Sequence, residues 1–299
     1  MKILLRSMPQ PEYPTEYLAA RLRGRRTGMI IDWKPFLGGQ QSLPVSSDQT
    51  IQADFSEELL WLYRQMNSSL RFDFHNIFLY YELRTLILAL RFMAGKQKAV
   101  ALELVKRSLL NEDILLLLQK NDACLPFLHE LTGYMKAWPE LHPWLKNQSA
   151  ANDFKACEIM LFSMMLQNMA RQETHPLLLL FIKLHIDFHN SLNLLKHDRW
   201  LRQRPDRVIP GGNRNHRMLL RLINRKFGEA NLTPLVLNEA AAAFIKDMHL
   251  ELHHQFRAYD TIGLILEYIW LQYIERVNFG ILLHSEDLPL ERTARELIR

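Results

Sequence analysis

Helical periodicity runs through this chain from Phe55 almost to its end, and it limits the possible folds more than any other feature. Apolar residues recur three and four positions apart, the pattern of one helix face, whereas runs of alternating β-branched residues are nearly absent. Leu is abundant, and 299 residues contain 11 Gly and 13 Pro. The sequence therefore predicts an all-α protein with few tight hairpins.

Composition places the chain among ordinary globular proteins. It is 48% hydrophobic and 23% charged, so it can bury a substantial core. Its formal charge of +5 is compatible with an anionic partner without requiring one. No apolar run reaches the ~18 to 20 residues of a membrane span, and the first residues form too short an apolar run for a secretory signal.

Two cysteines, Cys124 and Cys157, lie in helix-like patterns rather than in a disulfide framework. Their apolar surroundings favour inert thiols, and neither has the context of a catalytic nucleophile. We therefore expect a protein of a reducing compartment, soluble and cytoplasmic.

An acid-x-x-Asn pair occurs three times in long helical patterns. Its members are Asp73 with Asn76, Asp187 with Asn190, and Glu275 with Asn278. Residues three apart share a helix face, and the pairs lie in line with apolar residues, so each pair should be partly buried and hydrogen-bonded to neighbouring segments. These pairs are our candidate structural sites.

The segments after the three long helices are also similar. Each has a Gly or Pro stop and then a short amphipathic run: residues 99–107, 218–227 and 290–298. A recurring tetrapeptide alone is weak evidence, but a recurring order of long helix, stop and short helix indicates an internal repeat. We divide the chain into three helical repeats, 1–110, 111–212 and 213–299, the first including an N-terminal helix and a loop.

The expected helices are derived from periodicity, caps and breakers. The first begins at Thr15, whose side chain should cap it, and an irregular loop covers residues 27–50. The others are expected to begin near Ser56 and to cover, approximately, residues 72–92, 98–107, 112–119, 122–137, 139–146, 152–172, 176 onward, 218–227, 234–256 and 260 onward, before the last at 290–298. Methionines at 160, 164, 165 and 169 are interpreted as core filling rather than as a binding surface.

Arginines gather at two places. The end of the first helix holds Arg21, Arg25 and Arg26, which form either a solvated helix end or a contact surface. The irregular segment around Pro210 holds Arg204, Arg207 and Arg214, without a Walker or GxGxxG pattern. These six arginines are our candidate partner contacts.

Three histidine groups have spacings that could suit a metal ion. His249 and His253 are four apart, as are His185 and His189 on either side of Asp187, and His197 precedes Asp198 as in metal-dependent phosphohydrolases. No further ligands can be assigned, so no metal, cofactor or catalytic residue is predicted. Helix-turn-helix and zinc-finger spacings are not evident, so no nucleic-acid partner is predicted.

Three segments resemble the family of central-stalk subunits of V/A-type rotary ATPases, known as the C type in prokaryotes and the d type in eukaryotes. They are EYLAARLRGR from Glu16 to Arg25, IDFHNSLNLLKHDRW with the later VIPGG between Ile186 and Gly212, and the final helices from Ala258 to Ile298. The resemblance implies a funnel of three similar helical domains with pseudo-threefold symmetry.

The resemblance also implies a function. Such a subunit is not catalytic; it sits on the cytoplasmic face of the membrane and joins the proteolipid rotor ring to the central shaft, coupling ATP hydrolysis or synthesis to proton or sodium transport. The membrane surface would be an indirect partner. Two alternatives stay open: a helical metal-dependent phosphohydrolase using the histidines, and a cytoplasmic helical adaptor unrelated to ATPases.

Overall fold

The computed structural model describes residues 4–11, 14–30, 32–37, 41–44, 47–131, 154–199, 208–227, 234–257, 260–285 and 289–298. Regular secondary structure in these residues is helical, with α-helices, one short 3-10 helix at Lys34–Phe36 and no β-strand. The prediction of an all-α fold is confirmed. Among the described helices, none combines the length and apolar character needed to cross a membrane.

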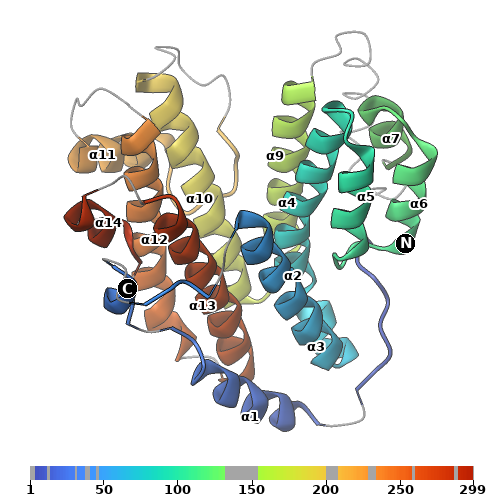
Figure 1. The fold of residues 1–299 in the computed structure, drawn as a ribbon, viewed down its shortest axis with the longest axis horizontal. Helices are drawn as coiled ribbons and strands as arrows, with labels where there is room; N and C mark the ends of the chain where they lie inside the picture. Colours follow the sequence, from blue (N-terminus) through green and yellow to red (C-terminus); the bar gives the residue numbers. More distant parts are fainter. Residues whose placement is uncertain are drawn as a thin grey trace. The chain divides into compact units, whose positions relative to one another are not determined.

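The chain divides into two compact units, residues 1–12 with 56–173, and residues 13–55 with 174–299. The division into three repeats stays a prediction. The boundary at residue 55 falls within α2, Asp48–Gln65 (Figure 1).

The first unit is built around one long helix, most of whose residues are buried. This is α4, His75–Ala94, which packs against α5 and α9. The unit's other helices are α3, Ser68–Asp73; α5, Lys98–Lys106; α6, Glu112–Lys120; α7, Cys124–Leu131; and α9, Phe154–Gln172. Met165 and Met169 of α9 are buried, as expected for core filling, whereas Met160 and Met164 are half-buried.

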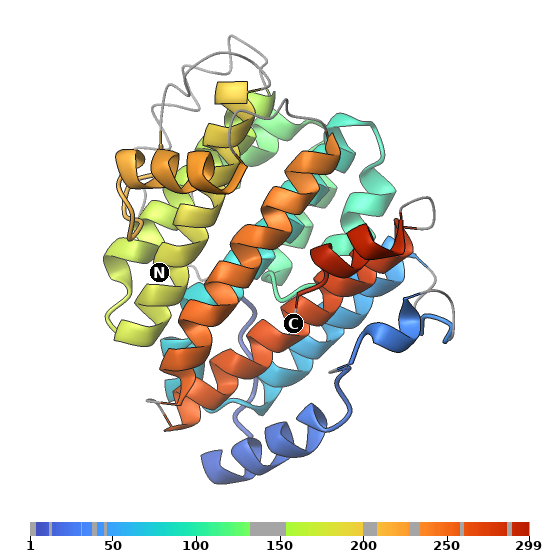
Figure 2. The ribbon, with the colours of Figure 1, turned by 90° about the vertical axis from the view of Figure 1, so that its left-hand side faces the viewer.

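The second unit contains three long helices. They are α10, Pro176–Arg199; α12, Pro234–Phe256; and α13, Asp260–Leu283. Figure 2 shows α12 and α13 side by side, with α1, Thr15–Arg26, against α13. The two short helices are α11, His216–Phe227, and α14, Leu290–Glu296.

Most helix boundaries lie within two residues of those expected, and the differences have local causes. The helix expected at 72–92 breaks at Phe74, because Asn67 caps a separate helix, α3, by accepting a hydrogen bond from the Leu70 N–H at 2.9 Å. Helix α2 begins at Asp48, inside the expected loop. Pro14, not Thr15, precedes α1 at the N-cap. The helix expected at 139–146 lies outside the described residues.

Several apolar side chains of the irregular segment between residues 27 and 47 pack against the end of α13. Trp33 is 4% exposed, and its ring lies 5.2 Å from that of Phe279 at the end of α13. It belongs to a cluster with Leu282 and Leu297. The segment therefore closes a small hydrophobic core at the C-terminal end of α13.

Candidate functional site

Asn190 holds the chain that returns after α10. Its side-chain amide donates to the Ile209 carbonyl at 2.8 Å and accepts from the Ile209 N–H at 2.8 Å. Asn190 is 3% exposed, so the reciprocal pair is shielded from water. An amide side chain carries both a donor and an acceptor, which is the requirement for pairing with both backbone groups of one residue.

Asp187, one turn earlier on the same face, holds the next part of this segment. Its two carboxylate oxygens accept from the backbone N–H of Arg214, at nitrogen–oxygen distances of 3.2 and 3.1 Å. Between these contacts the chain turns through Gly211, whose φ of 98° suits glycine, and passes Asp187 at Gly212. Asp187, Asn190 and residues 209–214 form what we term the α10 clamp.

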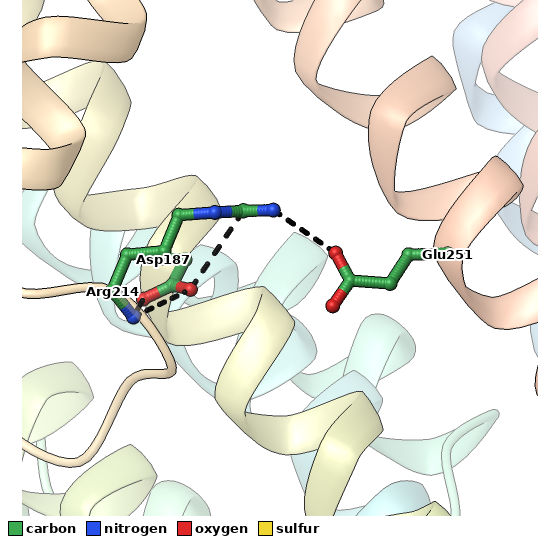
Figure 3. Close-up of polar contacts among 3 residues, drawn as sticks. All are labelled: Asp187, Arg214 and Glu251. Carbon is green, nitrogen blue, oxygen red and sulfur yellow. Dashed lines mark hydrogen bonds and ion pairs between the residues drawn. The ribbon is translucent and has the colours of Figure 1, made fainter.

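Arg214 connects the clamp to α12 (Figure 3). Its guanidinium lies 3.0 Å from Glu251 and 3.8 Å from Asp187, measured between nitrogen and oxygen. Burial raises the pKa of Asp187 to about 6, although the Arg214 N–H and guanidinium act in the opposite direction. Glu251, which lies between His249 and His253 in the sequence, is thus a partner of Arg214.

A second clamp, on α13, repeats the Asn contact. Asn278 donates to the Ile298 carbonyl at 2.9 Å and accepts from the Ile298 N–H at 2.8 Å. Glu275, one turn earlier, accepts from the Ile30 N–H at 2.9 Å. Glu275, Asn278, Ile30 and Ile298 form the α13 clamp, which joins α13 both to the segment after α1 and to the C-terminal segment.

Asp73 and Asn76 do not form a third clamp of this kind. They lie on different helices, α3 and α4, on either side of Phe74, so they do not share one helical stripe. Asn76 donates to the Glu173 carboxylate at 3.1 Å instead.

The corresponding backbone contact in the first unit comes from Glu82. Its carboxylate accepts from the Leu109 N–H at 2.9 Å, and Leu109 is 27 residues later, the same separation as between Asp187 and Arg214. Thr85 stands three residues after Glu82 and hydrogen-bonds its carboxylate. The sequence carries this signal as acid-x-x-Thr. A search that requires Asn three residues after the acid misses it.

The six candidate partner arginines have different environments. Arg26 pairs with Glu267 at 2.6 Å, and Arg25 donates to the Tyr268 hydroxyl at 3.1 Å, so both join α1 to α13. The Arg21 guanidinium lies 5.8 Å from the centroid of the Tyr17 ring. Arg204 and Arg207 lie outside the described residues. Since Arg214 belongs to the α10 clamp, it too makes its polar contacts within the chain, as Arg25 and Arg26 do.

The histidines take part in packing. His185 is 2% exposed; its Nδ1 lies 2.9 Å from the Phe181 carbonyl, which can only accept, so Nδ1 carries the proton. Trp270 donates to His249 Nδ1 at 3.0 Å, and burial together with His253 lowers the pKa of His249. Among the described residues, no three His, Cys, Asp or Glu side chains are grouped to hold a metal ion. The side chains of His197 and Asp198 lie outside the description.

Comparisons with family models and with curated proteins do not assign this chain to a family. No protein-family model matches the chain, and no curated protein matches it. A functional proposal for this chain therefore rests on its motifs and on the two clamps.

The close approach of Gly212 to Asp187 predicts an effect for Gly212→Ala. A Cβ at this position would overlap Asp187 Oδ1 and lie 3.2 Å from its Cγ, so the clamp must shift. We expect a loss of about 1 to 3 kcal/mol in the free energy of unfolding. Denaturant unfolding measures it.

Gly280→Ala is the matched control, because Gly280 lies within α13 and a Cβ there would meet nothing within 4 Å. It should stabilise the protein by roughly 0.5 to 1 kcal/mol. Equal effects of the two substitutions would contradict the role assigned to Gly212.

Proposed function

We propose that this chain is a non-catalytic central-stalk subunit of a V/A-type rotary ATPase. In this role it connects the proteolipid rotor ring to the central shaft and couples ATP hydrolysis or synthesis to proton or sodium transport. The chain would act at the cytoplasmic face of the membrane, with the ring and the shaft subunits as its partners.

The observation that carries the proposal is that the α10 clamp and the α13 clamp contain the same reciprocal Asn contact. Asn190 and Asn278 lie on separate long helices, each within an acid-x-x-Asn motif, and make the same reciprocal pair with a residue 19 or 20 positions later. One helical unit used more than once is what the resemblance implies. Such clamps stiffen a helical body, which supports a role in transmitting torque.

Affinity purification of the tagged chain from detergent-solubilised membranes of its host tests the proposal. We expect proteolipid and shaft subunits to be recovered with it, as identified by mass spectrometry. Recovery as a monomer from the soluble fraction, without ATPase subunits, would overturn the proposal. Metal analysis of the same preparation addresses the alternative enzyme, because a stoichiometric bound metal would favour a phosphohydrolase.

A further inference from the structure

Positive charge is concentrated in one segment of this chain. Residues 199–226 contain nine Lys or Arg and one acidic residue, Asp206, a formal net charge of +8. Because the whole chain carries +5, the remaining residues carry a net −3. The structure describes residues 208–226 of this segment, and α11 begins within it at His216. A local excess of this size attracts an anionic surface even when the net charge is modest.

Helix α11 turns its charges away from the core. Leu219 and Ile223 are buried in a cluster with residues of α10 and α12. Arg217, Arg221 and Arg225 are exposed, and their spacing of four places them in one row on the other side. Their Cα atoms span about 12 Å along the helix at ~1.5 Å per residue. The start of α11 is fixed by Asn215, whose side chain accepts from the Met218 N–H at 3.0 Å.

These three arginines have no acidic partner among the described residues. Their side chains make no ion pair or hydrogen bond with another described residue, and α11 itself contains no Asp or Glu. Arg26 and Arg214, by contrast, are paired with carboxylates. Met218, 48% exposed, lies beside the row. We call Arg217, Arg221, Arg225 and Met218 the α11 basic face.

We propose that the α11 basic face binds an anionic phospholipid surface, with the guanidinium groups on headgroup phosphates and Met218 at the edge of the apolar layer. A straight row of charges contacts a plane along its full length, and guanidinium groups match phosphate oxygens in geometry. Basic amphipathic helices bind membrane surfaces through such charge together with apolar contact.

The chemistry of the face favours lipid over other anionic partners. None of the described exposed side chains of α11 is aromatic, so the face lacks a platform on which bases could stack. It offers one exposed apolar side chain, Met218, rather than the cluster of anchors typical of a protein interface. Direct lipid contact goes beyond the proposed function, and it rests on the exposed arginine row and Met218 rather than on the ATPase assignment.

Sedimentation of the full chain with vesicles tests the inference. One vesicle type is phosphatidylcholine containing one-fifth phosphatidylserine, and the other is phosphatidylcholine alone. The triple variant R217Q/R221Q/R225Q should bind anionic vesicles roughly 100-fold more weakly than the wild type, at ~1 kcal/mol for each arginine and ~1.4 kcal/mol for each tenfold change. Neutral vesicles should bind neither protein.

The matched control is R23Q/R257Q/R295Q, which removes the same charge from exposed positions outside α11. It should weaken binding less than about threefold, since its charges are dispersed. Equal losses in the two variants, or equal binding to neutral vesicles, would overturn the proposal. So would tight binding of a DNA oligonucleotide without vesicle binding. Pure lipid contains no ATPase subunit, so this test can fail or succeed independently of the affinity purification.

Discussion

Asn278→Asp should lower the free energy of unfolding by about 3 to 5 kcal/mol at pH 8, as when a buried charge is left without a partner. Asn278 is 0% exposed, and its amide donates to the Ile298 carbonyl. The substitution keeps the size and the acceptor but removes this donor, so an ionised carboxylate would face the carbonyl oxygen. Chemical denaturation followed by circular dichroism measures the change.

The loss in Asn278→Asp should shrink as the pH is lowered. A protonated carboxyl can donate to the Ile298 carbonyl, and burial raises the pKa of the new carboxyl in the folded state above its ordinary value of about 3.9. The variant is therefore destabilised above the raised pKa of the new carboxyl, and it regains stability as the pH falls through that pKa. Asn193→Asp, the same change at an exposed position of α10, should alter stability by less than about 0.5 kcal/mol. Similar losses in both variants would contradict the clamp.

Glu82→Gln should make the protein more stable than the wild type above pH 7, by about 3 kcal/mol. Glu82 is 2% exposed, and burial raises its pKa from 4.5 to about 7, with ~1.4 kcal/mol for each tenfold change in the acid dissociation constant. One carboxylate oxygen accepts the Leu109 N–H, and the other has no hydrogen-bond partner among the described residues. Glutamine retains an acceptor for Leu109 and avoids the buried charge.

The stability of the wild type relative to Glu82→Gln should fall as the pH rises. Because the folded-state pKa is the higher one, the folded wild type holds the proton more tightly than the unfolded chain. The stability that the wild type gains from this bound proton is complete below pH 4.5 and is lost as the pH rises through about 7. Denaturation between pH 4 and 9 should therefore show the wild type falling relative to Glu82→Gln.

Glu57→Gln is the matched control for Glu82→Gln, because Glu57 is exposed on α2. It should shift stability by less than about 0.5 kcal/mol at every pH. Parallel pH profiles of the wild type and Glu82→Gln would show that Glu82 is not a buried titrating group.

The two clamps and Glu82 share a mechanical consequence. Each fixes a backbone segment remote in sequence to a long helix: Ile209 to α10, Ile298 to α13 and Leu109 to α4. A buried hydrogen bond to such a backbone group restricts how the segments can be arranged, because breaking it leaves a buried polar group unsatisfied. This restriction is useful to a protein that transmits force, and it supports the proposed role in a rotary machine.

The sequence predicted the long helices well because their signals are local. Pro176 and Pro234 begin helices in the structure as expected, and α13 begins at Asp260. The break at Phe74 was missed because the apolar period continues across it, while the cap at Asn67 starts α3 earlier in the chain. The early start of α2 was missed because its first residues are mostly polar, although Ile51 and Phe55, four residues apart, are buried there.

The clamps were predictable only in part. Asn190 and Asn278 were singled out by their spacing, but neither Ile209 nor Ile298 could be named as a partner, since each contact closes a loop of about twenty residues. Asp73 was singled out because Asn76 follows it three residues later, whereas Glu82 is followed at that spacing by Thr85; its contact with Leu109 is visible only in the structure. The pairing of Arg25 and Arg26 with α13 likewise depends on packing between distant helices.

The sequence by itself therefore determined the helices of this protein, their approximate ends and the polar pairs placed among apolar residues. Tertiary structure decided which polar groups meet and which arginines remain exposed on α11. The physical reason is that periodicity and capping act within a few residues, whereas hydrogen bonds between distant segments depend on how whole helices pack.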